Sequence, residues 1–150
     1  MKYTIPLLSI CAMVTFSCTD MSQKKGPGDS RTATKTTYCY SYTGNKDSIT
    51  MNIDINDNTV MGELEYHLYE KDSNTGTIKG IIKGDTLFAE YSFISEGTSS
   101  VRDVAFLKKE NNWVEGFGDV EENNGRVIFK DITSLQFNSN IVLTEVPCKE

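Results

Sequence analysis

The sequence has few of the features that an enzyme or a nucleic-acid-binding protein needs. Its 150 residues include a single histidine, and no serine or cysteine stands in a motif typical of a catalytic nucleophile. Only 15 basic residues face 21 acidic ones, and the resulting net charge of −6 opposes phosphate backbones. We therefore expect no enzymatic activity, no catalytic residue, no cofactor and no nucleic-acid partner.

A metal site is also poorly supported. The histidine, His67, shares the outer face of a predicted strand with Glu63 and Glu65. Zinc sites use three or four ligands, usually including cysteine or several histidines. A solvated polar face is the better interpretation, and we predict no metal ligand.

Long apolar runs are missing as well. The longest begins near Ile5 and ends at Phe16, which is too short for a membrane-spanning helix of about 20 residues. Positive Lys2 precedes this run and small Ser17 follows it. The pattern is typical of a secretory signal peptide over residues 1–17.

A cysteine, Cys18, stands directly at the expected cleavage point. This arrangement resembles the lipobox of bacterial lipoproteins, although Thr15 replaces the usual leucine-like residue and bulky Phe16 follows it. The resemblance implies that Cys18 carries a lipid such as palmitate and anchors the mature protein to a membrane. Residues 19–37 contain only two apolar residues, Met21 and Ala33, so we expect residues 18–37 to be an acylated, flexible tether.

Two cysteines, Cys39 and Cys148, remain in the part of the chain that we expect to fold. An even pair in an oxidising compartment predicts a disulfide. The alternative is a pair of free thiols acting as ligands or nucleophiles. It is the weaker interpretation because no histidine neighbours either cysteine.

From Tyr38 onward the apolar residues recur with a period of two, which predicts half-buried strands. Glycine, asparagine and aspartate separate these segments about every ten residues. The predicted strands cover residues 37–43, 48–56, 59–70, 76–84, 86–95, 100–109, 113–121, 126–131 and 140–147. A short helical turn is expected at Ile132 to Leu135.

Short strands joined by tight hairpins favour an all-β domain over residues 38–150. The preferred architecture is an antiparallel up-and-down β-barrel of about eight or nine strands, and a β-sandwich is the alternative. The segment from Gly76 to Tyr91, with residues 93–97 and 104–107, resembles small lipoproteins of the Bacteroidota cell envelope. That resemblance implies a location and a fold, and it brings no catalytic residue.

Aromatic residues provide the candidate ligand site. Tyr38, Tyr40 and Tyr42 share one face of the first strand, and Tyr91 lies on an inward-facing position of a later one. Such residues form either ordinary packed core, which is favoured, or the wall of a cup for an apolar or sugar-like ligand. Tyr38, Tyr40 and Tyr91 are the possible ligand-lining residues.

Two tripeptides, Asp47-Ser48-Ile49 and Asp85-Thr86-Leu87, resemble the O-glycosylation motif of Bacteroidota envelope proteins. The resemblance makes Ser48 and Thr86 possible acceptor residues.

Together these features predict a monomeric lipoprotein of the bacterial cell envelope, lipid-anchored at the outer membrane on its periplasmic or surface face. The expected role is a non-catalytic binding module for a small apolar or glycan ligand. A protein-interaction or inhibitor lipoprotein is the alternative.

Overall fold

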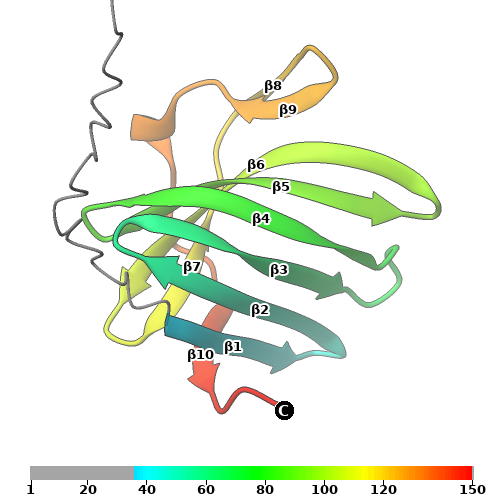
Figure 1. Cartoon of the computed structure of the whole chain (residues 1–150). Helices are drawn as coiled ribbons and strands as arrows, with labels where there is room; N and C mark the ends of the chain where they lie inside the picture. Colours follow the sequence, from blue (N-terminus) through cyan, green and yellow to red (C-terminus); the bar gives the residue numbers. More distant parts are fainter. Residues whose placement is uncertain (1–35, 150) are drawn as a thin grey trace, which may run out of the picture. The chain divides into compact units, whose positions relative to one another are not determined.

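The computed structural model describes residues 36–149, which form a closed antiparallel β-barrel of eight strands with two additional strands packed outside it (Figure 1). The ten strands are β1 (Thr36–Gly44), β2 (Asp47–Asn56), β3 (Thr59–His67), β4 (Asn74–Lys83), β5 (Thr86–Ser95), β6 (Thr98–Lys109), β7 (Asn112–Gly116), β8 (Val120–Asn123), β9 (Arg126–Phe129) and β10 (Val142–Val146). A short 3-10 helix, η1 (Ile132–Ser134), precedes β10.

Strands β1 to β7 follow one another around the barrel, each antiparallel to the previous one. β10 then lies between β7 and β1 and closes the ring. The predicted up-and-down barrel is therefore confirmed, and the sandwich alternative is wrong. Because the ring is closed, each of these eight strands is paired on both sides over at least part of its length.

Two-residue hairpins connect most of the barrel strands, as the asparagine, aspartate and glycine clusters predict. Asn45 and Lys46, between β1 and β2, have φ angles of 51° and 69°. Asp57 and Gly84 also have positive φ in the turns after β2 and β4. Glycine, asparagine and aspartate tolerate the left-handed conformation that two-residue hairpins require, and Lys46 adopts it as well.

The inward-facing side chains fill the barrel. Trp113, Tyr91 and Phe106 each have 0% of their surface exposed. They belong to one cluster of buried residues contributed by strands all around the ring. The period-two pattern thus places alternate residues in a common core, and burial of these large side chains is the main stabilising term.

The sequence-based prediction fails at 113–121. β7 ends at Gly116, and Phe117 then forms a bridge with Gln136 instead of continuing beside β6. A Cβ atom on Gly116 would overlap the Phe137 ring, so the close approach of this segment requires glycine. The chain next forms the β8–β9 hairpin, the orange hairpin in Figure 1, outside the ring.

Several predicted boundaries are also shifted. β1 begins at Thr36, inside the region assigned to the tether, and β3 ends at His67 instead of residue 70. The helical turn is confirmed, and the Asp131 side chain caps it by accepting a hydrogen bond from the Thr133 amide at 2.8 Å.

The predicted disulfide is confirmed: Cys39 on β1 is bonded to Cys148, which follows β10. The signal peptide, Cys18 and nearly all of the tether lie outside the described residues. Within residues 36–149 no helix is long and apolar enough to cross a membrane.

Candidate functional site

The three tyrosines predicted to line a ligand site lie in or beside the packed core. The single Tyr91 hydroxyl hydrogen is shared between two acceptors, the Leu64 carbonyl at 2.9 Å and Asn74 Oδ1 at 2.8 Å. Tyr40 packs edge-on against Trp113, with ring centroids 6.4 Å apart. Tyr38 is half-buried and stacks on Tyr40. Their contacts are those of core residues, and a role in ligand binding stays a prediction.

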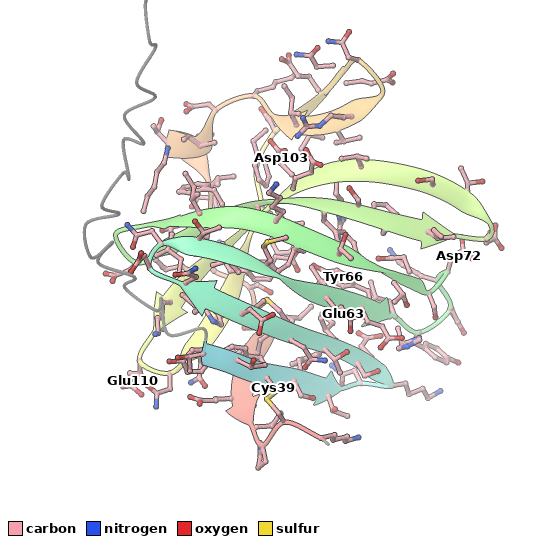
Figure 2. All side chains as sticks on the ribbon, viewed as in Figure 1. Cys39, Glu63, Tyr66, Asp72, Asp103 and Glu110 are labelled. Atoms are coloured by element: carbon pink, nitrogen blue, oxygen red, sulfur yellow. A yellow bond between two sulfur atoms is a disulfide. The ribbon has the colours of Figure 1, made fainter. Side chains whose placement is uncertain are left out.

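A polar cluster lies among these aromatic rings. Glu115 on β7 faces the interior and is only 6% exposed. The hydroxyl of Tyr66 on β3 donates a hydrogen bond to Glu115 Oε1 at 2.8 Å. The position of Tyr66 in the barrel can be followed in Figure 2. This hydrogen bond joins opposite parts of the barrel wall, because β3 and β7 are not neighbouring strands.

Burial controls the ionisation of this pair. Desolvation raises the pKa of the Glu115 carboxyl, while the Tyr66 hydrogen bond and the nearby Arg102 charge oppose that shift. Desolvation also holds the pKa of Tyr66 well above its usual value. Both shifts favour the neutral forms that a low-dielectric interior stabilises.

Arg102 on β6 is the third member of the cluster. Its guanidinium carbon lies 5.1 Å from the ring centroid of Tyr66, 5.6 Å from that of Tyr91 and 5.7 Å from that of Phe93. Such distances are those of cation–π contacts. Its Nε is buried with no hydrogen-bond partner, and Arg102 has no ion pair within 4.0 Å in the described part of the chain.

Arg102 and Glu115 both line a cavity at a split in the barrel wall. β6 and β7 stay paired only as far as Ala105 and Gly116, beyond which β7 turns away. β6 pairs instead with β9, in parallel, through Val101 and Arg102. The resulting wall cavity measures about 170 Å³ and is lined by Arg102, Asp103, Val104, Glu115, Gly116, Phe117, Gly118, Val120, Val127 and Phe129.

The outer part of the wall cavity is apolar. Phe117, Val120 and Val127 are 51%, 47% and 41% exposed, respectively. They come from the β7–β8 connection and from the β8–β9 hairpin, which lies over the split. The cavity therefore combines three charged residues, Arg102, Asp103 and Glu115, with an apolar rim.

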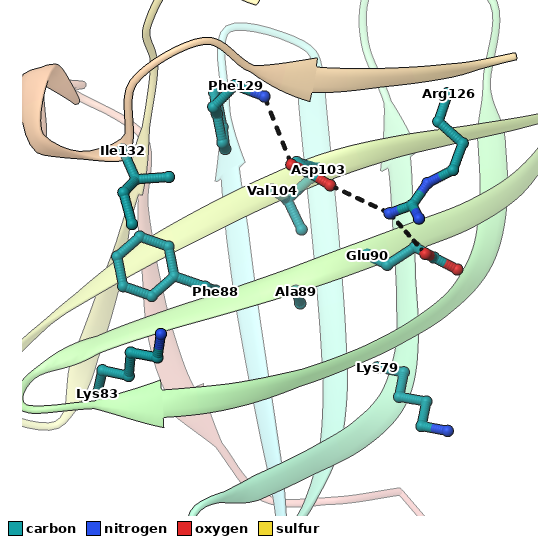
Figure 3. Close-up of a pocket in the computed structure, with 10 residues that line it drawn as sticks. All are labelled: Lys79, Lys83, Phe88, Ala89, Glu90, Asp103, Val104, Arg126, Phe129 and Ile132. Carbon is teal, nitrogen blue, oxygen red and sulfur yellow. Dashed lines mark hydrogen bonds and ion pairs between the residues drawn. The ribbon is translucent and has the colours of Figure 1, made fainter. Parts of the chain in front are cut away.

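Charged side chains fasten the hairpin to the barrel. The Phe129 amide donates to Asp103 Oδ2 at 3.4 Å, and Arg126 Nη2 lies 3.5 Å from Asp103 Oδ1 and 2.7 Å from Glu90 Oε2 (Figure 3). These contacts come from β9 on one side and from β5 and β6 on the other. They fix the strand that carries Val127 and Phe129 over the cavity.

Other concave surfaces lie outside the barrel. A groove of about 220 Å³ runs beside the Arg126 cluster, between Phe88 and Ile132 (Figure 3). A larger hollow of about 570 Å³ lies by the disulfide, where Thr50, Asn52 and Glu65 line it. Neither contains a charged residue that the fold buries, which distinguishes the wall cavity from both.

The remaining predicted residues lie apart from the wall cavity. His67 forms contacts with Glu65 Oε1 at 2.7 Å and with Ser73 Oγ at 2.8 Å. Among residues 36–149 no group of three histidine, cysteine or acidic side chains is arranged to hold a metal ion. Ser48 and Thr86 are half-buried strand residues next to hairpin turns, and their glycosylation stays a prediction.

Sequence reasoning missed Arg102 and Glu115, although a signal was present. Arg102 lies two residues before Val104, and Glu115 lies two residues after Trp113, each of which is an inward-facing apolar residue. A period of two therefore places both charged residues inside the barrel.

Comparisons with known proteins give no relative: no protein-family model, no curated protein and no solved structure matches this chain.

Proposed function

We propose that the protein is a lipid-anchored binding protein of the bacterial cell envelope, and that the wall cavity is its binding site. The observation that carries this proposal is the contrast between a filled barrel interior and a cavity that reaches buried Glu115 and half-buried Arg102, whose Nε is buried without a partner. Ligand sites are typically apolar hollows with a few placed polar groups.

The size of the wall cavity restricts its occupant. Drug-sized ligands occupy pockets of about 300–1,000 Å³, whereas a buried apolar cavity of about 150 Å³ holds benzene. At about 170 Å³ the wall cavity suits a small molecule or one end of a larger one. A glycan is too large to enter a cavity of this volume and would contact only its rim. A small ligand with an apolar body fits better.

Export is supported by the disulfide and by the N-terminal pattern. Disulfides persist in oxidising compartments, and Cys39–Cys148 is bonded here. The lipobox-like sequence ending at Cys18 provides the anchor, and a second acyl chain would be needed for stable attachment because one chain gives only marginal binding.

A protein-interaction role is the second candidate, and the exposed rim favours it. Phe117, Val120 and Val127, with nearby Ile132, present apolar side chains on the outer surface. Exposed apolar groups gathered around a cavity also suit an inserted side chain of a partner protein.

Blocking the cavity tests the binding proposal. Val120→Trp should fill the wall cavity, and Val146→Trp, on a residue that does not line it, is the matched control. A library of small apolar compounds should raise the melting temperature of the wild type and of Val146→Trp, and should leave that of Val120→Trp unchanged. If no compound stabilises the wild type, or if all three proteins respond equally, the proposal fails.

The anchor has a separate test. In cells fed an alkyne-labelled fatty acid, the wild type and Cys11→Ala should be labelled and should sediment with membranes. Cys18→Ala should be unlabelled and should appear in the soluble fraction. Labelling of Cys18→Ala at the wild-type level would contradict acylation at this residue.

A further inference from the structure

We propose that the wall cavity binds a small carboxylate with an apolar body, and that Arg102 is the residue that recognises the carboxylate. This inference rests on the proposed function, because it names the ligand class of the same cavity.

The first argument is that Arg102 has unused hydrogen-bond donors. A guanidinium carries five N–H groups and stays charged at every physiological pH. In the described structure it makes no hydrogen bond and no ion pair, and its neighbours are the rings of Tyr66, Tyr91 and Phe93. Its Nε is buried, and leaving a buried charged donor unsatisfied is costly, so the position is explained if an acceptor binds there.

The aromatic neighbours also suit this role. The N–H groups of a guanidinium lie in its plane. Aromatic rings that stack on the two faces of that plane leave these N–H groups free to form hydrogen bonds. They limit the rotamers of a long side chain, which lowers the entropy lost when a ligand binds. Arginine matches carboxylates particularly well because two parallel N–H groups can bond both oxygens.

The second argument concerns Glu115. This carboxyl already accepts a hydrogen bond from Tyr66, and Asp103, the other acid in the lining, accepts from the Phe129 amide and lies beside Arg126. The buried donor without a partner is therefore Arg102 Nε, which favours an acceptor ligand. Burial raises its pKa, which reduces the repulsion that an ionised Glu115 would exert on a bound anion.

The third argument is the lining of the outer part. Its exposed apolar lining residues are Phe117, Val120 and Val127, and Val104 and Phe129 line it as well. A ligand whose carboxylate reaches Arg102 would place its body against these side chains. The small volume suits a single aromatic ring or a short alkyl chain.

Three ligands of one shape test the inference on the unaltered protein: phenylacetate, phenylacetamide and phenethylamine. Titration calorimetry should give a Kd for phenylacetate at least about tenfold lower than that for either other compound, since hydrogen bonds to charged groups are worth more than neutral ones. Equal affinities, or tightest binding of the amide or the amine, would overturn the carboxylate assignment while leaving a binding function in place. If none of the three binds and the compound library also fails, both proposals fall.

A variant pair locates the interaction. Arg102→Gln should weaken phenylacetate binding at least about tenfold and should leave phenylacetamide binding unchanged. Lys79→Gln, an exposed β4 residue that does not line the wall cavity, removes the same charge and should bind phenylacetate like the wild type. Equal weakening by both variants would overturn the assignment to Arg102. Should Arg102→Gln fail to fold, the ligand series on the wild type still decides the question.

Discussion

At the scale of single residues, Glu115 shows how the interior charge affects stability. Its pKa is higher in the folded protein than in the unfolded chain because burial penalises the carboxylate. The folded state therefore binds more protons, and the stability of the wild type falls as the pH rises from the unfolded pKa through the folded one.

Glu115→Gln should remove this dependence, because the amide carries no charge and its oxygen can still accept from Tyr66. We expect the variant to have a higher melting temperature than the wild type at neutral pH, and the difference should disappear below about pH 4, where both side chains are neutral. Thermal unfolding followed by circular dichroism between pH 3 and pH 8 measures the effect. Glu121→Gln, at an exposed β8 residue, is the control and should show no such trend.

An equal melting temperature of Glu115→Gln and wild type at every pH would contradict the pKa shift. A variant less stable than the wild type at neutral pH would instead show that the attraction between Glu115 and Arg102 outweighs the desolvation of the carboxylate.

At the scale of elements, Phe137 packs against Gly116 at the point where β7 leaves β6. A methyl group at residue 116 would overlap the Phe137 ring. Gly116→Ala should therefore lower the free energy of unfolding by about 1–3 kcal/mol, the usual cost of overpacking a filled site. Urea denaturation of both single variants and of Gly116→Ala/Phe137→Ala forms a double-mutant cycle.

The double variant should be more stable than the sum of the single effects predicts, because Phe137→Ala leaves room for the new methyl group. Additive effects within about 0.5 kcal/mol would show that the close contact does not determine where β7 ends.

The β8–β9 hairpin offers a second test at this scale. Asp103→Ala removes the acceptor of the Phe129 amide and one partner of Arg126, so the amides of residues 120–129 should exchange hydrogen faster. The barrel amides in β1 to β5 should keep their exchange rates, since partly exposed ion pairs contribute at most about 1 kcal/mol. Equally faster exchange in β2 would contradict the view that the hairpin opens independently.

These elements also show what the sequence could and could not predict. The meander from Tyr38 to Lys109 was readable because most of its strands alternate and most of its turns contain glycine, asparagine or aspartate. The path after Gly116 was not, since β7 looks like the start of a longer strand. At its end the chain meets Phe137 and Gln136, and these contacts join segments about twenty residues apart, which no local pattern contains.

The same limit applied to the wall cavity. The alternation of β6 and β7 could have placed Arg102 and Glu115 inside the barrel. Their meeting with Tyr66 depends on ring closure, which brings β3 and β7 to face each other across the interior. The predicted tyrosines were inward-facing, as expected, but the volume around them is occupied by Trp113 and Phe106.

At the scale of the whole molecule, the disulfide closes nearly the entire described chain. Cys39 and Cys148 are 109 residues apart in sequence, and the bond joins the first barrel strand to the segment after the last one. A cross-link over so long a loop removes much conformational freedom from the unfolded chain, and the entropy model gives about 4.7 kcal/mol for 100 residues.

We therefore expect Cys39→Ser/Cys148→Ser to lose about 2–5 kcal/mol of unfolding free energy, measured by urea denaturation. The loss should come mainly from the higher conformational entropy of the unfolded chain. The folded variant should therefore keep the circular dichroism spectrum of the barrel. Adding a reductant should destabilise the wild type by the same amount and should leave the variant unchanged. Unequal losses from reduction and from substitution would show that the buried Cys39 also stabilises the native packing of β1, which the entropy model does not include.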